Sequence, residues 1–71
     1  MKDAIQLLDV VVLAQDLPEN NLRQGTIGTV VEKFSDNDFL VEFADQEGKA
    51  YAFEELTAKQ LLKVYYEPIR A

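Results

Sequence analysis

The stretch Gly25-Thr-Ile-Gly-Thr-Val-Val-Glu32 decides the fold of this chain. Glycine permits backbone angles and close approaches that other residues resist. Two glycines three residues apart, followed by a β-branched run, therefore predict a loop that turns tightly into a bent strand. A second apolar run follows the turn sequence Ser35-Asp-Asn-Asp38. The pattern is typical of a small β-barrel, and it contains no catalytic motif.

The rest of the chain divides into short strands separated by turns. Runs of β-branched and aromatic residues with turn residues between them predict strands over residues 8–14, 26–34, 39–44, 49–53 and 61–66. Pro18 and two asparagines predict a long loop over 15–24. Thr57-x-x-Gln60 matches a capping box, which predicts one helical turn before the last strand.

These elements predict an all-β fold in one domain over residues 1–71. Five short strands with tight later hairpins suit a closed or nearly closed barrel, since closure removes the exposed edges of a sheet. A three-helix fold is excluded because the β-branched residues cluster and turn signals recur too often. From the alternation within each strand, the predicted core is Leu8, Val10, Val12, Ile27, Val30, Phe39, Val41, Phe43, Ala52, Leu62 and Val64.

The first predicted strand is apolar on both faces, with Val11 and Leu13 opposite Val10 and Val12. A barrel buries one face only, so the second set needs another cover, either the long loop or a second molecule. We therefore expect an interaction surface, for a partner or for self-association as a homodimer. Its expected members are Val11, Leu13, Leu61 and Tyr65, with the surrounding carboxylates Asp16 and Glu42.

Composition and charge narrow the class of protein. The chain of 71 residues has no cysteine, which fits a reducing cytosol, and its longest wholly apolar run, 10–14, is far too short to span a bilayer. The start, Met1-Lys2-Asp3, lacks the profile of a signal peptide. We therefore expect a soluble, cytoplasmic protein with no membrane partner.

The net charge of −6, from thirteen acidic and seven basic residues, disfavours nucleic acid as a partner. Binding to a phosphate backbone depends on neutralisation by Lys and Arg. Two interpretations of the acidic residues remain open. They form a solvated surface that keeps the protein soluble, or they steer it toward a basic partner.

The sequence resembles a family of small, mostly bacterial proteins described as domain of unknown function 4926. The resemblance covers roughly residues 5–64, in the motifs Leu8-Asp-Val-Val-Val-Leu13, Asp16-Leu-Pro18, Gly25-x-x-Gly28-Thr-Val-Val-Glu32, Val41-Glu-Phe43 and Leu56-Thr-x-x-Gln60-Leu61. It implies a compact SH3-like β-barrel and no settled biochemical role. Family members are said to lie beside other small genes, in a manner similar to toxin–antitoxin or immunity pairs. The glycine-centred strand is also similar to the KOW motif, whose domains are usually basic.

The sequence lacks two of the residue types that most often form catalytic or metal-binding sites. Histidine and cysteine are absent, so the commonest general base, metal ligand and nucleophile are missing. Ser35 and the pairs Asp36/Asp38 and Asp45/Glu47 lie in predicted turns, where turn geometry explains them. We therefore predict no enzyme, no cofactor and no metal. Gly25-x-x-Gly28 lacks the lysine and the following helix of a phosphate-binding loop.

These residues bear on three candidate functions. The leading hypothesis is a non-enzymatic protein-interaction module. Its most concrete version is an acidic antitoxin- or immunity-like partner that covers a basic site on a neighbouring protein. The alternative is a KOW-like domain that binds nucleic acid or ribonucleoprotein, which the scarcity of Lys and Arg argues against. An enzyme would need a carboxylate pair or cofactor that the sequence does not supply. A groove for proline-rich peptides is disfavoured, because tryptophan is absent.

Overall fold

The computed structural model describes residues 4–45 and 47–64. This part of the chain forms five strands and two 3-10 turns, in the order β1 (Val10–Leu13), η1 (Pro18–Asn20), β2 (Ile27–Lys33), β3 (Asp38–Ala44), β4 (Ala50–Thr57), η2 (Ala58–Gln60) and β5 (Leu61–Lys63). All strand pairs are antiparallel. The predicted all-β class is therefore confirmed.

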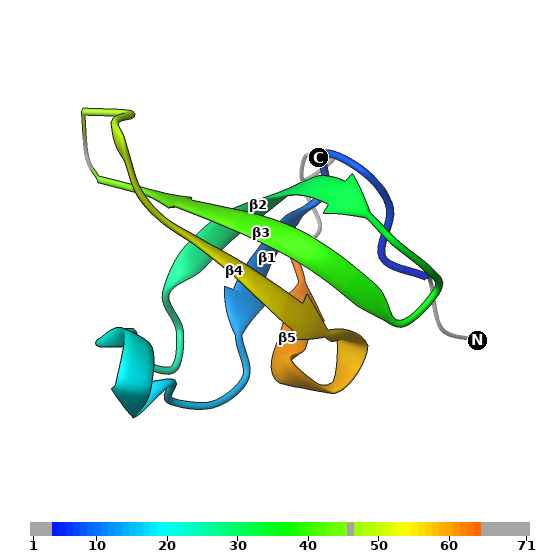
Figure 1. Cartoon of the computed structure of the whole chain (residues 1–71), viewed down its shortest axis with the longest axis horizontal. Coiled ribbons are helices and arrows are strands. Elements are labelled where there is room, and N and C mark those ends of the chain that lie inside the picture. The colour runs from blue at the N-terminus through cyan, green and yellow to red at the C-terminus, as the bar shows by residue number, and fades with distance from the viewer. Residues whose placement is uncertain (1–3, 46, 65–71) are drawn as a thin grey trace, which may run out of the picture.

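The strands form one sheet in the order β4-β3-β2-β1-β5. The sheet curls strongly, so that β3 and β4 cross over β1 and β5 with the core between them (Figure 1). In the described residues β4 pairs only with β3, and β5 only with β1. The expected closed barrel is wrong, because η2 turns the chain from β4 onto β1 and the two edge strands are not hydrogen bonded to each other.

The predicted strand positions are confirmed more closely in the middle of the chain than at its ends. The first strand begins two residues later than predicted because Leu8 has a φ of 71°, in the left-handed region, where a strand does not continue. Strand β4 extends to Thr57, four residues beyond its predicted end. Strand β5 ends at Lys63, and the predicted positions 65 and 66 lie outside the described residues.

The two glycines of the deciding stretch have the roles that the sequence predicted. Gly25 has a φ of +90°, which suits a glycine at the tight turn into β2. Gly28 faces the core between β1 and β3, opposite Val11 and Phe43. A Cβ atom at Gly28 would lie 2.6 Å from Val41 Cγ1 and 2.9 Å from Phe43 Cε1, so only glycine fits.

The capping box predicted before the last strand is also present. The side-chain Oε1 of Gln60 accepts two hydrogen bonds from Thr57. One comes from the Thr57 backbone N–H at 2.9 Å and the other from the Thr57 hydroxyl at 3.3 Å. The Gln60 carbonyl accepts the Ala14 N–H at 2.8 Å. This turn therefore ties the end of β4 to the end of β1.

The core lies on the concave side of the curled sheet. Its members among the described residues are Ile5, Val11, Leu13, Leu22, Val30, Phe39, Val41, Phe43, Leu56 and Leu61. The predicted core residues Val30, Phe39, Val41 and Phe43 are confirmed, and Ala52 packs against this cluster. The other predicted members are only half-buried or exposed: Leu8, Val10, Val12, Ile27, Leu62 and Val64.

The error in the predicted core is a shift of one residue in β1 and β5. Both faces of β1 are apolar, so the alternation along this strand does not distinguish the inner face from the outer one. Its register does: Val11 lies opposite the inward-facing Gly28, and Leu13 lies opposite Leu61. Val11 and Leu13 are therefore core residues, and their neighbours Val10 and Val12 face outward.

Candidate functional site

Most of the expected interaction surface is not available on the outside of the molecule. Val11, Leu13 and Leu61 are 0%, 1% and 4% exposed, because the sheet of this same chain covers them. The expectation that these three side chains form an exposed surface is wrong. Tyr65 lies outside the described residues.

Asp16 holds the long loop between β1 and β2 in place. Its Oδ1 accepts a hydrogen bond from the backbone N–H of Gln24 at 2.7 Å, which joins the two ends of the loop. The loop is closed further by paired backbone hydrogen bonds between Leu17 and Leu22. The Asp16 carboxylate therefore has a structural partner within the loop, whereas Glu42 belongs to β3.

The other carboxylates considered from the sequence occupy turns. Asp45 Oδ1 accepts the backbone N–H groups of Glu47 and Lys49, each at 2.9 Å. In the preceding hairpin, Ser35 Oγ lies 3.2 Å from Asp38 Oδ2 and accepts the Asn37 N–H at 3.2 Å. Among the described residues no group of three acidic side chains could hold a metal ion. The same residues include no helix long and apolar enough to cross a membrane.

Glu42 lies on the outer face of β3 and belongs to a group of carboxylates on three strands. Its cross-strand partners are Thr29 on β2 and Phe53 on β4. Two residues before it, Leu40 lies opposite Glu32 on β2 and Glu55 on β4. We define Glu32, Leu40, Glu42, Phe53 and Glu55 as the acidic face.

The register brings the three carboxylates of the acidic face onto neighbouring strands. Glu32 and Glu55 are each diagonal neighbours of Glu42, a relationship that spaces residues by roughly 7–8 Å in an antiparallel sheet. Long side chains at that spacing share one partner surface without hydrogen bonding to each other. An incoming group of positive charges could therefore contact all three carboxylates.

None of these three carboxylates takes part in an ion pair within the described residues. The ion pairs of that part of the chain lie elsewhere, between Lys33 and Asp36 at 3.7 Å and between Lys63 and Asp9 at 3.2 Å. Like charges at this spacing repel one another, and no ion pair among the described residues offsets that repulsion. A positively charged partner would relieve this repulsion.

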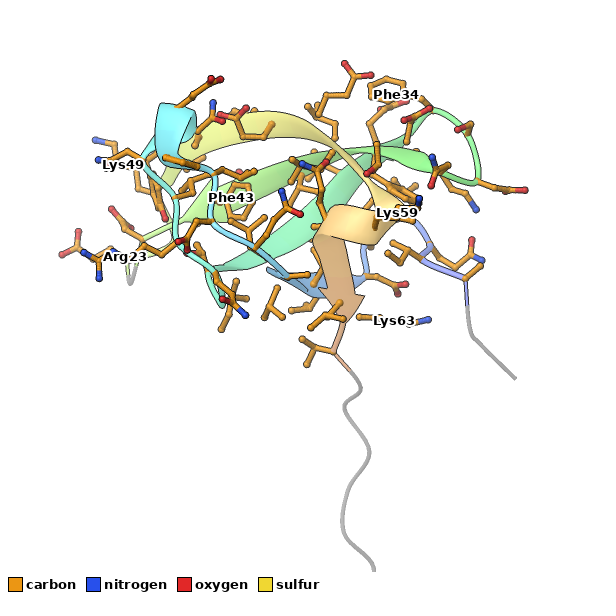
Figure 2. The ribbon with its side chains drawn as sticks, turned by 90° about the horizontal axis from the view of Figure 1, so that it is seen from below. Arg23, Phe34, Phe43, Lys49, Lys59 and Lys63 are labelled. Atoms are coloured by element: carbon orange, nitrogen blue, oxygen red, sulfur yellow. The ribbon has the colours of Figure 1, made fainter. Side chains whose placement is uncertain are left out.

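Aromatic side chains lie beside these charges. Phe53 is 55% exposed and lies next to Glu42 on the same face of the sheet. Phe34, just beyond the end of β2, is also exposed and stands above the sheet, whereas Phe43 lies beneath its ribbons in the core (Figure 2). A shallow hollow adjoins the face, lined by Ile27, Gly28, Thr29, Glu42, Ala44 and Asp45. The face therefore offers apolar contact area together with charge.

A second outward surface, which is apolar, lies on β1, β5 and the start of β2. Val12 on β1 pairs with Ile27 on β2 and with Leu62 on β5, and Ile27 and Leu62 are 61% and 57% exposed. We name Leu62, Val12 and Ile27 the apolar row. It contains the side chains that the sequence placed in the core, now on the outer face.

The sequence identified Glu42 but missed the other members of the acidic face. The alternation of residues 39–44 already places Leu40 and Glu42 on one side of a strand. The partners of these two residues on β2 and β4 depend on strand register, and β2 has a bulge between Val30 and Glu32 that shifts it. No pattern in the sequence locates that bulge.

The described residues define an all-β chain built on one open five-stranded sheet, whose outer face carries unpaired carboxylates and exposed aromatics. The family model for "Domain of unknown function (DUF4926)" matches residues 7–63, which include every strand of this sheet. The chain belongs to this family. Comparisons with curated proteins and with solved structures gave no match.

Proposed function

We propose that this chain is a non-enzymatic protein-interaction module that binds a basic surface of another protein through its acidic face. One observation carries the proposal. Glu32, Glu42 and Glu55 lie on three adjacent strands around Leu40, and none of the three has an ion pair among the described residues. Solubility alone does not require that like charges gather on one face.

The chemistry of the face suits a basic protein surface. Complementary charge accelerates encounter and selects the partner, and the net charge of −6 extends this attraction beyond the contact itself. Exposed aromatic side chains such as Phe53 supply the apolar anchors that dominate binding energy in protein interfaces. A second copy of the chain is a poor partner for this face because it presents the same charges.

The most concrete form of the proposal is an inhibitor of the antitoxin or immunity type, acting in the cytoplasm on the product of a neighbouring gene. An acidic inhibitor can cover a basic active site without any chemistry of its own. The strand order and the 3-10 turn before β5 support an open SH3-like sheet as the scaffold. Nucleic-acid binding is the weaker alternative, since phosphates would meet the carboxylates of the acidic face.

The test is co-expression with the neighbouring gene product, followed by co-purification and measurement of the dissociation constant. The informative variant is Glu42→Gln with Glu55→Gln, which removes two carboxylates from the face. Glu19→Gln with Glu47→Gln is the matched control, because it removes two exposed carboxylates that lie in η1 and in the β3–β4 turn.

We expect the Glu42/Glu55 variant to bind more weakly by roughly tenfold to a hundredfold, and the control to bind within about threefold of the wild type. The wild-type complex should also weaken as salt concentration rises. Equal effects of the two double variants would contradict a localised acidic interface. Tight binding of a nucleic acid at low salt, with no binding of the neighbouring protein, would favour the alternative.

A further inference from the structure

The open edge of β4 lies directly beside the acidic face. This strand runs over eight residues, Ala50–Thr57, and pairs with β3 alone in the described part of the chain. A strand edge presents unpaired N–H and C=O groups that another extended chain can use. How this edge would hold a basic partner protein is a question that rests on the proposed function.

The hydrogen-bond pattern shows which residues of β4 point their backbone groups at this edge. The Ala58 N–H bonds to the Asn37 carbonyl at 3.0 Å, which fixes the alternation of the β3–β4 ladder. In an antiparallel pair, every second residue directs its N–H and C=O away from the partner strand. Counting back from Ala58, those residues are Thr57, Glu55 and Phe53.

The end of the edge at Thr57 is already closed. The Thr57 N–H points away from β3 and is accepted by the Gln60 side chain at 2.9 Å, which agrees with the alternation. Asn20 reaches the neighbouring Glu54 from the other side of the strand, where its Nδ2 donates to Oε2 at 2.9 Å. Among the described residues, the backbone groups left open in the regular part of the ladder are those of Phe53 and Glu55, and Tyr51 lies at the register shift that ends it.

The same two residues carry side chains of the acidic face. A strand added to β4 would therefore place every second side chain on the outer face beside Phe53 and Glu55, with Glu42 one strand further in. Arginine or lysine at those alternating positions would meet unpaired carboxylates. Side chains at the intervening positions would point toward Glu54 and the loop that contains Asn20.

The geometry points to β-strand addition as the binding mode: an extended basic segment of the partner protein pairs antiparallel with β4 at Phe53 and Glu55. Backbone hydrogen bonds then supply affinity, and alternating basic residues supply selectivity. A second copy of the chain is a poor occupant of this position, because antiparallel pairing of Phe53 with Glu55 of the other copy would place Glu54 directly opposite its own counterpart.

The experiment uses the wild-type chain and a synthetic peptide of alternating arginine and valine with blocked ends. In an antiparallel pairing, residues that lie opposite each other share a face and exchange their hydrogen bonds, so the arginines next to the acidic face also direct their N–H groups at β4. One derivative is N-methylated at its arginines, and a matched derivative is N-methylated at its valines. Both keep the charge and side chains of the parent peptide.

We expect N-methylation of the arginines to weaken binding by about tenfold or more, since it removes at least two backbone hydrogen bonds, and N-methylation of the valines to change binding by less than about threefold. Amide hydrogen exchange at Phe53 and Glu55 should slow in the complex with the parent peptide. Equal binding of the two methylated peptides would overturn strand addition, as would no binding of the parent at millimolar concentration.

The outcomes separate this inference from the proposed function. If the two methylated peptides bind alike and Glu42→Gln with Glu55→Gln still weakens binding, the acidic face remains and strand addition fails. If that double variant binds the parent peptide as tightly as the wild type does, the proposed function fails. Binding of the parent peptide to the wild-type chain and to the double variant is also measured as the salt concentration rises. A smaller salt dependence in the double variant shows that its loss of affinity comes from the removed charges.

Discussion

Leu61 and Leu62 are consecutive residues of β5 on opposite faces of the sheet. Leu61 is 4% exposed and pairs with the buried Leu13, whereas Leu62 is 57% exposed and pairs with the half-buried Val12. The two side chains have the same chemistry, so the sequence does not show which one belongs to the core. Their comparison tests the assignment of inner and outer faces.

Leu61→Ala should lower the free energy of unfolding by about 2–5 kcal/mol, because it leaves a cavity in the core. Leu62→Ala should change it by less than about 1 kcal/mol, since most of that side chain already contacts water. Chemical denaturation of both variants measures the difference. A larger loss at Leu62 than at Leu61 would reverse the faces of β5 and β1.

Gly28→Ala should destabilise the chain by about 1–3 kcal/mol because the added methyl group overlaps Val41 Cγ1 in the core. Val41→Ala removes the nearest of the atoms that the added methyl group would overlap. The double variant should therefore lose less free energy of unfolding than the sum of the two single losses, by about 1 kcal/mol in a double-mutant cycle. Strict additivity of the two losses would show that Gly28 does not approach β3 this closely.

The fold could be predicted where the sequence carries a local signal. Alternation identified Phe39, Val41 and Phe43 as core, and the Thr57-x-x-Gln60 motif located the last turn. Barrel closure and the faces of β1 could not be predicted in this way, because they depend on pairing between distant strands. One signal was available in the sequence. If Gly28 faces inward, its neighbour Ile27 must face outward, yet the predicted core included Ile27.

Gln60→Ala should destabilise the chain by about 1 kcal/mol, because the Thr57 N–H then loses its acceptor at the edge of β4. Gln60→Glu should be close to wild type, since a carboxylate fills the same role in a capping box. Thermal unfolding compares the two variants. Equal losses from both would show that this hydrogen bond does not stabilise the turn.

Asp9→Ala should cost about 1–2 kcal/mol, because this half-buried carboxylate accepts the Gln6 N–H at 2.7 Å and pairs with Lys63. Asp36→Ala should leave stability unchanged, since its carboxylate is fully exposed and lies 3.7 Å from Lys33. Raising the salt concentration should weaken only the ionic part of the Asp9 contribution. A similar loss from both substitutions would contradict the difference in their surroundings.

The candidate site shows the same limit as the fold. Glu42 was accessible to sequence reasoning as the polar member of an alternating strand. Its neighbours Glu32 and Glu55 are ten and thirteen residues away in the chain, and only the strand register brings them to one face. Acidic residues that are spread along a sequence can therefore form a localised surface.

The most direct test of the acidic face is to map the contact by NMR, titrating the isotope-labelled chain with the neighbouring gene product. We predict that the largest chemical-shift changes fall on β3 and β4, at Leu40, Glu42, Phe53 and Glu55, and that Val12 and Leu62 change little. Changes centred on the apolar row, with the acidic face unaffected, would contradict the account.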